Sequence, residues 1–100
     1  MLGTKIVMDE DKIIKEKRYD LNKIYKILDD TAYNFSFIKQ DKFTYIVKDD
    51  EEALSNMGRF CFETLMNSKW FIENVKEWLF LDSEEGNSDM MVEIKKAMQK

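Results

Sequence analysis

The feature that most constrains the fold is a change in the spacing of apolar residues near the middle of the chain. Before residue 49, aromatic and β-branched residues concentrate in short segments at 4–8, 35–39 and 42–48, as they do in strands. After Asp50 the spacing becomes helical, and the acidic run 49–52 stands where a helix start favours carboxylates. No proline-rich, glycine-rich or repetitive linker interrupts the chain. We therefore expect one α+β domain over residues 1–100, with an antiparallel sheet packed against helices.

The front half is expected to be mainly sheet, with one helix. In chain order its elements are strands at 4–8 and 12–19 around the turn 9–11, a helix at 21–33, and a hairpin with arms at 35–39 and 42–48. The helix is the clearest of these, because Asp20 is placed to cap it and its apolar residues form one stripe. The second strand is the least clear, because the charged sequence of residues 15–18 would equally suit the start of a helix.

The back half is expected to be helical, which gives the order ββαββααα. The first helix starts at Asp50, the second covers 69–81, and the third is capped by Ser88 after a loop at 82–87. The residues expected to face inward are Leu54, Met57, Gly58, Cys61 and Leu65 in the first helix and Phe71, Ile72, Val75, Trp78 and Leu79 in the second. Phe60 and Phe62 are expected to flank the stripe of the first helix, and the third helix carries Met90, Met91, Ile94 and Met98.

Residues that carry chemistry are scarce. The chain has no histidine, no proline and a single cysteine, so most general-base, nucleophile-activation and metal-binding schemes have no agent. Cys61 lies within an inward stripe and is expected to be a core residue. Residues 82–93 imitate a calcium loop, but Gly86 stands at the fifth position and not the sixth, where the sharp turn requires glycine. We therefore predict a non-enzymatic protein with no cofactor and no metal.

The apolar inventory suits contact with another protein. The chain holds two tryptophans, seven phenylalanines and seven methionines, which are residue types common in interface cores. Trp70 and Phe80 fall outside the inward stripe of the helix expected over 69–81. They are either buried between layers or part of a homodimer or docking face. We expect protein–protein binding through the helical half, with the candidate residues Trp70, Phe80, Met66, Met90, Met91 and Met98.

Two alternatives follow from the uneven charge. Residues 1–48 carry ten Lys and Arg against eight Asp and Glu (+2), and residues 49–100 carry six against twelve (−6). The front half could bind nucleic acid through Lys12, Lys15, Lys17, Arg18, Lys23, Lys26, Lys39 and Lys42. The hairpin aromatics Phe35, Phe37, Phe43 and Tyr45 could form a stacking platform, although core packing is the favoured interpretation. The acidic back half could instead mimic nucleic acid in a basic protein groove.

The sequence gives no sign of a signal peptide or of an internal disulfide. No apolar stretch of signal-peptide length precedes residue 9, and one cysteine cannot form an internal disulfide. We therefore expect a cytoplasmic protein. The frequent Lys, Ile, Asn, Phe and Tyr are typical of an AT-rich, bacterial genome.

Overall fold

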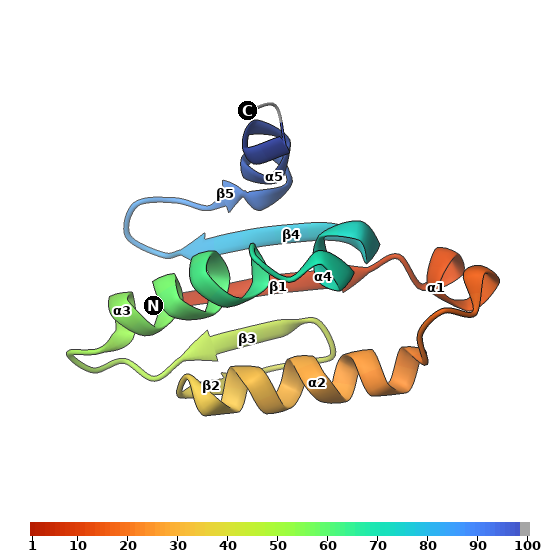
Figure 1. Cartoon of the computed structure of the whole chain (residues 1–100). Coiled ribbons are helices and arrows are strands. Elements are labelled where there is room, and N and C mark those ends of the chain that lie inside the picture. Colours follow the sequence, from red (N-terminus) through yellow and green to blue (C-terminus); the bar gives the residue numbers. More distant parts are fainter. Residues whose placement is uncertain (99–100) are drawn as a thin grey trace.

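The protein is an α+β domain in which most of the helices lie over one face of an antiparallel sheet (Figure 1). The computed structural model describes residues 1–98, and the side chain of Met98 lies outside that description. Its elements are β1 (Leu2–Met8), α1 (Glu10–Glu16), α2 (Leu21–Asn34), β2 (Phe37–Lys39), β3 (Thr44–Val47), α3 (Ala53–Gly58), the π-helix η1 (Arg59–Leu65), α4 (Lys69–Asn74), β4 (Val75–Asp82), β5 (Ser88–Asp89) and α5 (Met90–Met98). The expected fold class is confirmed, whereas the element order differs from ββαββααα in three places, at α1, β4 and β5.

The first strand is the centre of the sheet. The strand order is β2-β3-β1-β4-β5, and each neighbouring pair is antiparallel. Thr4 of β1 lies opposite Tyr45 of β3 on one side and Phe80 of β4 on the other, so these side chains share a face. That face also carries Ile6 and Trp78 and is covered by the helices. The sheet therefore joins the first residues of the chain to a segment more than 70 residues away.

The strand expected at 12–19 is wrong, because this segment contains helix α1. The Asp9 carboxylate accepts a hydrogen bond from the Lys12 backbone N–H at 3.2 Å, which makes Asp9 an N-cap. Glu10 and Asp11 then occupy the first turn, where the helix dipole favours acids. The acidic triplet therefore begins a helix and does not turn a hairpin.

The helix expected over 69–81 is also wrong beyond Asn74. Helix α4 ends at Asn74, and Val75 begins strand β4 with an extended backbone. The Asn74 side chain ends the helix by donating to the Trp70 carbonyl oxygen at 2.7 Å, while the Asn74 carbonyl accepts from the Asp9 N–H at 2.7 Å. The β-prone sequence that follows pairs with β1 along its whole length. Trp78 still faces inward, but Leu79, expected to be inward, lies on the opposite face of the sheet.

A π-helix changes which residues face the core between α3 and α4. In η1 the Met66 N–H bonds to the Cys61 carbonyl at 3.0 Å, the i→i+5 pattern of a π-helix. This wider turn lets the adjacent Phe60 and Cys61 both point inward, so Phe60 is fully buried although it was expected at the flank. Leu54 was expected to be inward but is 70% exposed, because Ala53 and Met57 form the inner face of α3.

The last helix is where the sequence predicts it, with a different cap. Ser88 belongs to the short strand β5, and the Asp89 carboxylate accepts the Met91 N–H at 2.9 Å. Met90 and Ile94 of α5 are buried, as expected for its inner face. The predicted Met98 side chain lies outside the described residues.

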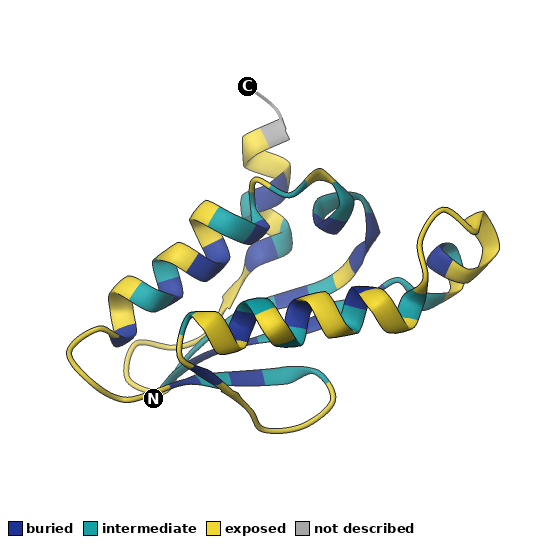
Figure 2. Ribbon diagram, turned by 60° about the horizontal axis from the view of Figure 1, so that its bottom comes forward, coloured by how far each residue is buried: buried dark blue, intermediate teal, exposed yellow. Residues whose placement is uncertain are grey.

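The core is built around the aromatic side chains of the hairpin and the π-helix. Phe35, Phe37 and Tyr45 all pack against Phe60, with ring centroids 6.1, 4.8 and 6.3 Å away. Core packing of these hairpin aromatics is thus confirmed, while the fourth, Phe43, lies beside the Tyr25 ring. The buried faces of the helices point to the sheet, and their exposed faces point outward (Figure 2).

Candidate protein-binding surfaces

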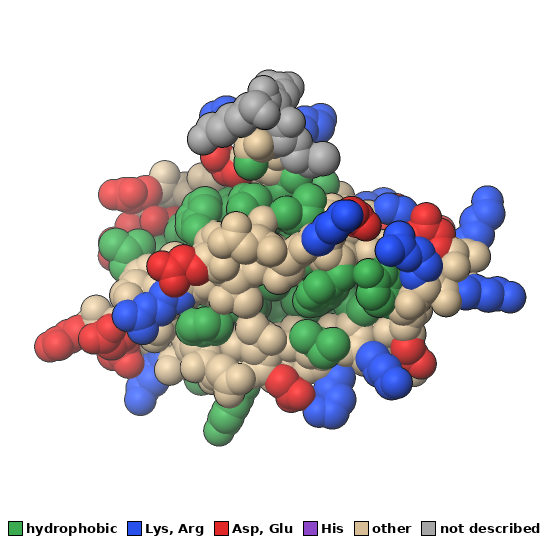
Figure 3. Space-filling model, in the orientation of Figure 1, with side chains coloured by type: hydrophobic (Ala, Val, Ile, Leu, Met, Phe, Trp, Pro, Cys, Tyr) green, Lys and Arg blue, Asp and Glu red, His purple; other side chains and the backbone are tan. Residues whose placement is uncertain are grey.

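An apolar groove opens between η1, β4 and α5. It has a volume of about 220 Å³ and is lined by Phe62, Phe80, Ser88, Met90 and Glu93. The Phe62 and Phe80 rings lie 6.4 Å apart, and Phe62 is 46% exposed, while Met90 is buried. Figure 3 shows hydrophobic side chains gathered along β4, beneath the C-terminal helix. We call these five lining residues the Phe62 groove.

The structure brings together only part of the predicted partner-binding set. Phe80 and Met90 meet in the Phe62 groove, although Phe80 reaches it from a strand and not from a helix. Trp70, Met66 and Met91 are half-buried and pack against the core cluster; the Trp70 ring stands edge-on to Phe71 at 5.9 Å.

Phe62 is the aromatic residue of the groove that was not among the candidate partner-binding residues, although it was expected at the flank of its helix. The sequence does contain an indication, because Phe62 lies outside the inward stripe of its helix, which is an unusual place for an aromatic residue. The wider turn of the π-helix, which aims Phe62 at Phe80, cannot be read from an α-helical projection.

A second apolar surface is the face of the sheet turned away from the helices. We call it the open face; its outward residues in β2, β3, β1, β4 and β5 are Ile38, Thr44, Ile46, Gly3, Lys5, Val7, Glu77, Leu79, Leu81 and Asp89. Half of them are aliphatic, and Ile38 is 67% exposed. The polar members include the ion pair between Lys5 and Glu77, with a nitrogen–oxygen distance of 3.3 Å. Sequence reasoning missed this face because β4 was expected to be a helix.

The predicted nucleic-acid residues lie around α1 and α2, and most are already engaged. Figure 3 shows Lys and Arg side chains mixed with acidic ones at the α1 end of the molecule. Four cations form ion pairs and a fifth bonds a carbonyl: Lys26 with Asp30, Lys39 with Asp29, Lys42 with Glu10, Arg18 with Glu73, and Lys12 with the Glu73 backbone oxygen. Lys15, Lys17 and Lys23 are exposed. The structure therefore gathers these cations but offsets much of their charge.

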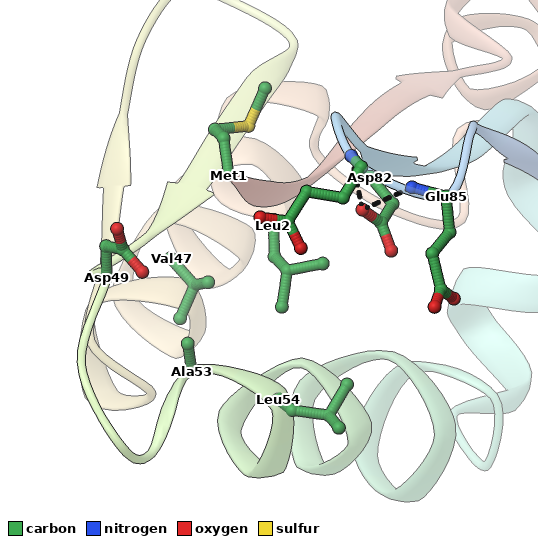
Figure 4. Close-up of a pocket in the computed structure, with 9 residues that line it drawn as sticks. Met1, Leu2, Val47, Asp49, Ala53, Leu54, Asp82 and Glu85 are labelled. Carbon is green, nitrogen blue, oxygen red and sulfur yellow. Dashed lines mark hydrogen bonds between the residues drawn. The ribbon is translucent and has the colours of Figure 1, made fainter.

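The two acidic loops of the back half meet at the opposite end of the molecule. A hollow of about 260 Å³ is lined there by Met1, Leu2, Val47, Asp49, Ala53, Leu54, Asp82, Glu84 and Glu85 (Figure 4). Asp82 accepts the backbone N–H groups of Glu84 and Glu85, and these bonds lower the pKa of the Asp82 carboxyl. Within residues 1–98, no three Cys, Asp or Glu side chains come together as a metal site requires.

The buried titratable groups hold their protons. Burial raises the pKa of the Cys61 thiol to about 12, as expected for a core cysteine. Burial, with hydrogen bonds to carboxylates, also raises the pKa of Tyr45 and of Tyr25. Tyr45 donates to Asp29 at 2.5 Å and Tyr25 donates to Glu10 at 2.6 Å. These hydroxyls tie β3 and α1 to α2 and act as structural donors.

Comparisons with protein-family models, with curated proteins and with solved structures found no match for this chain. Within the described residues, no helix has the length and apolar character that crossing a membrane requires.

Proposed function

We propose that the protein acts by binding a segment of another protein in the Phe62 groove, and that it has no catalytic role. The observation that carries this proposal is the exposure of Phe62 beside Phe80 over a hollow that the helices leave open. Exposed aromatic residues at the edge of an apolar hollow are typical of interface anchors. Two of the five groove residues, Phe80 and Met90, are candidate partner-binding residues in the sequence.

The groove has the size of one anchoring side chain. A volume of about 220 Å³ accommodates one large aliphatic or aromatic residue of a partner, with Met90 as its floor. Methionine adapts its shape to the inserted group, and the two rings offer edge and face contacts. A segment with one apolar anchor is therefore the favoured occupant.

The charge around the groove favours a basic segment. Glu93 lines the groove, where it also lies 3.8 Å from the Lys96 ammonium, and Glu63 follows Phe62 in the chain. The back half as a whole carries a balance of −6. Lys or Arg residues on either side of the anchor would therefore be attracted and would accelerate encounter.

Panning a random-peptide phage library against the immobilised chain tests the proposal. We expect enriched peptides with one aromatic or large aliphatic residue flanked by Lys or Arg. Phe62→Ser should weaken their binding at least tenfold, because it removes the exposed wall of the groove. The matched control is Tyr33→Ser, which removes a 79% exposed aromatic ring from α2 and should leave binding unchanged. Peptides that bind Phe62→Ser as well as the wild type would contradict the proposal.

Nucleic-acid binding by the front half is the first alternative. The exposed Lys15, Lys17 and Lys23 favour it, and the ion pairs described above oppose it. Replacing these three lysines with glutamine should abolish a low-salt mobility shift if the alternative holds, because phosphate binding depends on such cations.

Mimicry of nucleic acid is the second alternative, favoured by the meeting of the two acidic loops. Asp49 comes from one loop and Asp82, Glu84 and Glu85 from the other, around one hollow. A basic, DNA-handling partner displaced by DNA would distinguish mimicry from groove binding.

A further inference from the structure

We propose that a second copy of this chain covers the open face, so that two sheets pack face to face and the helices lie outside. This interface lies on the far side of the sheet from the helical layer and does not depend on the function proposed for the Phe62 groove. The resulting dimer would have four layers, helix–sheet–sheet–helix, as in other proteins built from packed sheets.

Three of the strands contain runs with the composition of strands that are buried on both faces. A sheet with one face in water normally alternates apolar and polar residues. Here β4 contains the unbroken apolar run Trp78–Leu81, β3 contains Tyr45–Val47, and β1 contains Ile6–Met8. In each run the inward residues fill the core, while the outward ones lie on the open face. The helices cover only the inward residues. The outward residues would be buried only if another layer packed on the open face.

The dimensions of the protein fit a missing layer. Its Cα extents are 41 × 31 × 19 Å, so it is a slab whose thin direction holds one sheet and one helical layer. A second slab across the open face would double the thin dimension and give a nearly isotropic particle. The accessible surface of 6632 Å² also exceeds the roughly 6,000 Å² expected for a compact 12.0 kDa monomer.

The area of the open face indicates a weak dimer. Its strands contain 7, 3, 4, 8 and 2 residues. At about 3.4 Å per residue and about 4.8 Å between strands, they present roughly 400 Å² of flat sheet. Two such faces together bury about 800 Å², which is below the roughly 1,000 Å² of a stable, specific interface and lies in the range of weak, transient contacts. We therefore expect reversible association in the micromolar range.

The charges on the open face suit a second copy better than a charged partner. Lys5 and Glu77 neutralise each other near its centre, and Asp89 lies at its edge. Apart from Asp89 the charges on this face cancel, so it repels its own copy only weakly, whereas the hollow lined by Asp49, Asp82, Glu84 and Glu85 would repel its copy strongly. Because the helices end up outside, each protomer keeps its groove free, and the dimer would present two grooves on opposite sides.

Sedimentation velocity from about 1 to 500 μM tests the dimer. We expect the weight-average sedimentation coefficient to rise with concentration from the monomer to the dimer value. Ile46→Lys should shift the dissociation constant at least tenfold, because it places a charge in the apolar part of the open face. Ile38→Lys, at a 67% exposed position of the same face, should also weaken the dimer without affecting folding. Leu54→Lys is the matched control, because Leu54 is 70% exposed on a helix and should leave association unchanged.

A cysteine at the centre of the face identifies the surface used. β1 is the middle strand and Lys5 is its central outward residue, so Lys5 lies near the two-fold axis of a dimer whose two faces are centred on each other. Cys61 is fully buried, so Lys5→Cys adds one reactive thiol. A bismaleimide that spans about 10 Å, the spacing of packed sheets, should link two copies of Lys5→Cys, whereas it should not link two copies of Asn22→Cys, which is on the exposed surface of α2.

Three results would overturn the proposal: a monomer at every concentration, a dimer that Leu54→Lys weakens as much as Ile46→Lys, or equal cross-linking at both cysteines. In each case peptide binding at the Phe62 groove would be unaffected, so failure of the dimer is distinguishable from failure of the proposed function.

Discussion

Gly3 is the residue on which the close approach of the two central strands depends. A Cβ at this position would lie 2.5 Å from the Tyr45 carbonyl oxygen and 2.8 Å from the Ile46 Cδ1 atom. The first neighbour is backbone, so β1 and β3 would have to separate to make room. The missing side chain also lets Ile46 lie across β1 on the open face. Glycine is thus required here by space, not by an unusual backbone angle.

Replacing Gly3 with alanine should therefore destabilise the protein by about 1–3 kcal/mol, the usual cost of forcing an extra group into a packed site. Urea denaturation measures the change. Gly58→Ala is the matched control, because nothing lies within 4 Å of the added methyl in the continuous α3–η1 helix. That substitution should stabilise by roughly 0.5–1 kcal/mol. Equal effects at the two positions would contradict the close approach of β1 and β3.

Cys61 predicts how the stability changes at alkaline pH. The thiol has an ordinary pKa of 9.0, and burial raises the pKa to about 12 in the folded state. Above pH 9 the thiol of the unfolded chain loses its proton, whereas the buried thiol of the folded chain keeps it. The stability that the thiol contributes below pH 9 is therefore lost as the pH rises toward 12.

The free energy of unfolding should accordingly fall more steeply above pH 9 in the wild type than in Cys61→Ala, by up to about 1.4 kcal/mol per pH unit. The variant keeps Tyr25 and Tyr45, whose pKa values are also raised, so the difference between the two proteins isolates the thiol. Urea titrations at pH 8, 9.5 and 10.5 measure it. Parallel curves would show that Cys61 is not buried in solution.

At the scale of elements, the accuracy of sequence reasoning depends on where the deciding contact lies. Helix α2 was predicted because its cap, Asp20, and its stripe are both local in sequence. The helix predicted over 69–81 is wrong beyond Asn74, although the spacing of Phe71, Val75 and Trp78 fits a helix. Val75–Asp82 is a strand because it pairs with β1, about 70 residues away in the chain. Local periodicity cannot report such pairing.

The residues of the candidate surfaces also divide into those that local sequence reveals and those that depend on the folded structure. Phe80 and Met90 were selected as surplus apolar residues, which composition and spacing reveal. Phe62 and the open face were missed, because the first depends on a π-helical turn and the second on the identity of β4 as a strand. An apolar run such as Trp78–Leu81 is compatible with either kind of element until its partner is known.

Helix α1 supplies a test of the corrected element. Asp9→Ala removes the carboxylate that accepts the Lys12 N–H and should cost about 1 kcal/mol of stability. Asp11→Ala removes a neighbouring acid that only favours the dipole of the first turn, and should cost about 0.3–1 kcal/mol. Thermal or urea unfolding of the two variants measures the difference. A larger loss for Asp11→Ala would contradict Asp9 as the N-cap.

At the scale of the whole molecule, charge and apolar surface are separated in space. The cations gather around α1, and the acidic loops gather at the opposite end near Leu2 and Leu54. The open face lies between these ends and carries the balanced pair Lys5–Glu77. Each protomer has a net charge of −4, so a dimer carries −8 and its halves repel each other at long range.

Added salt should therefore strengthen self-association, because it screens this repulsion and leaves the apolar contact intact. Raising NaCl from 50 to 500 mM shortens the screening length from about 14 to about 4 Å. We expect the dissociation constant of the dimer to fall several-fold over this range in sedimentation experiments. Nucleic-acid binding would respond in the opposite direction, because salt competes with the cations for phosphate. Ile46→Lys should stay monomeric at both salt concentrations, and a wild-type dimer that weakens as salt is added would show that ion pairs, not the apolar open face, hold the two copies together.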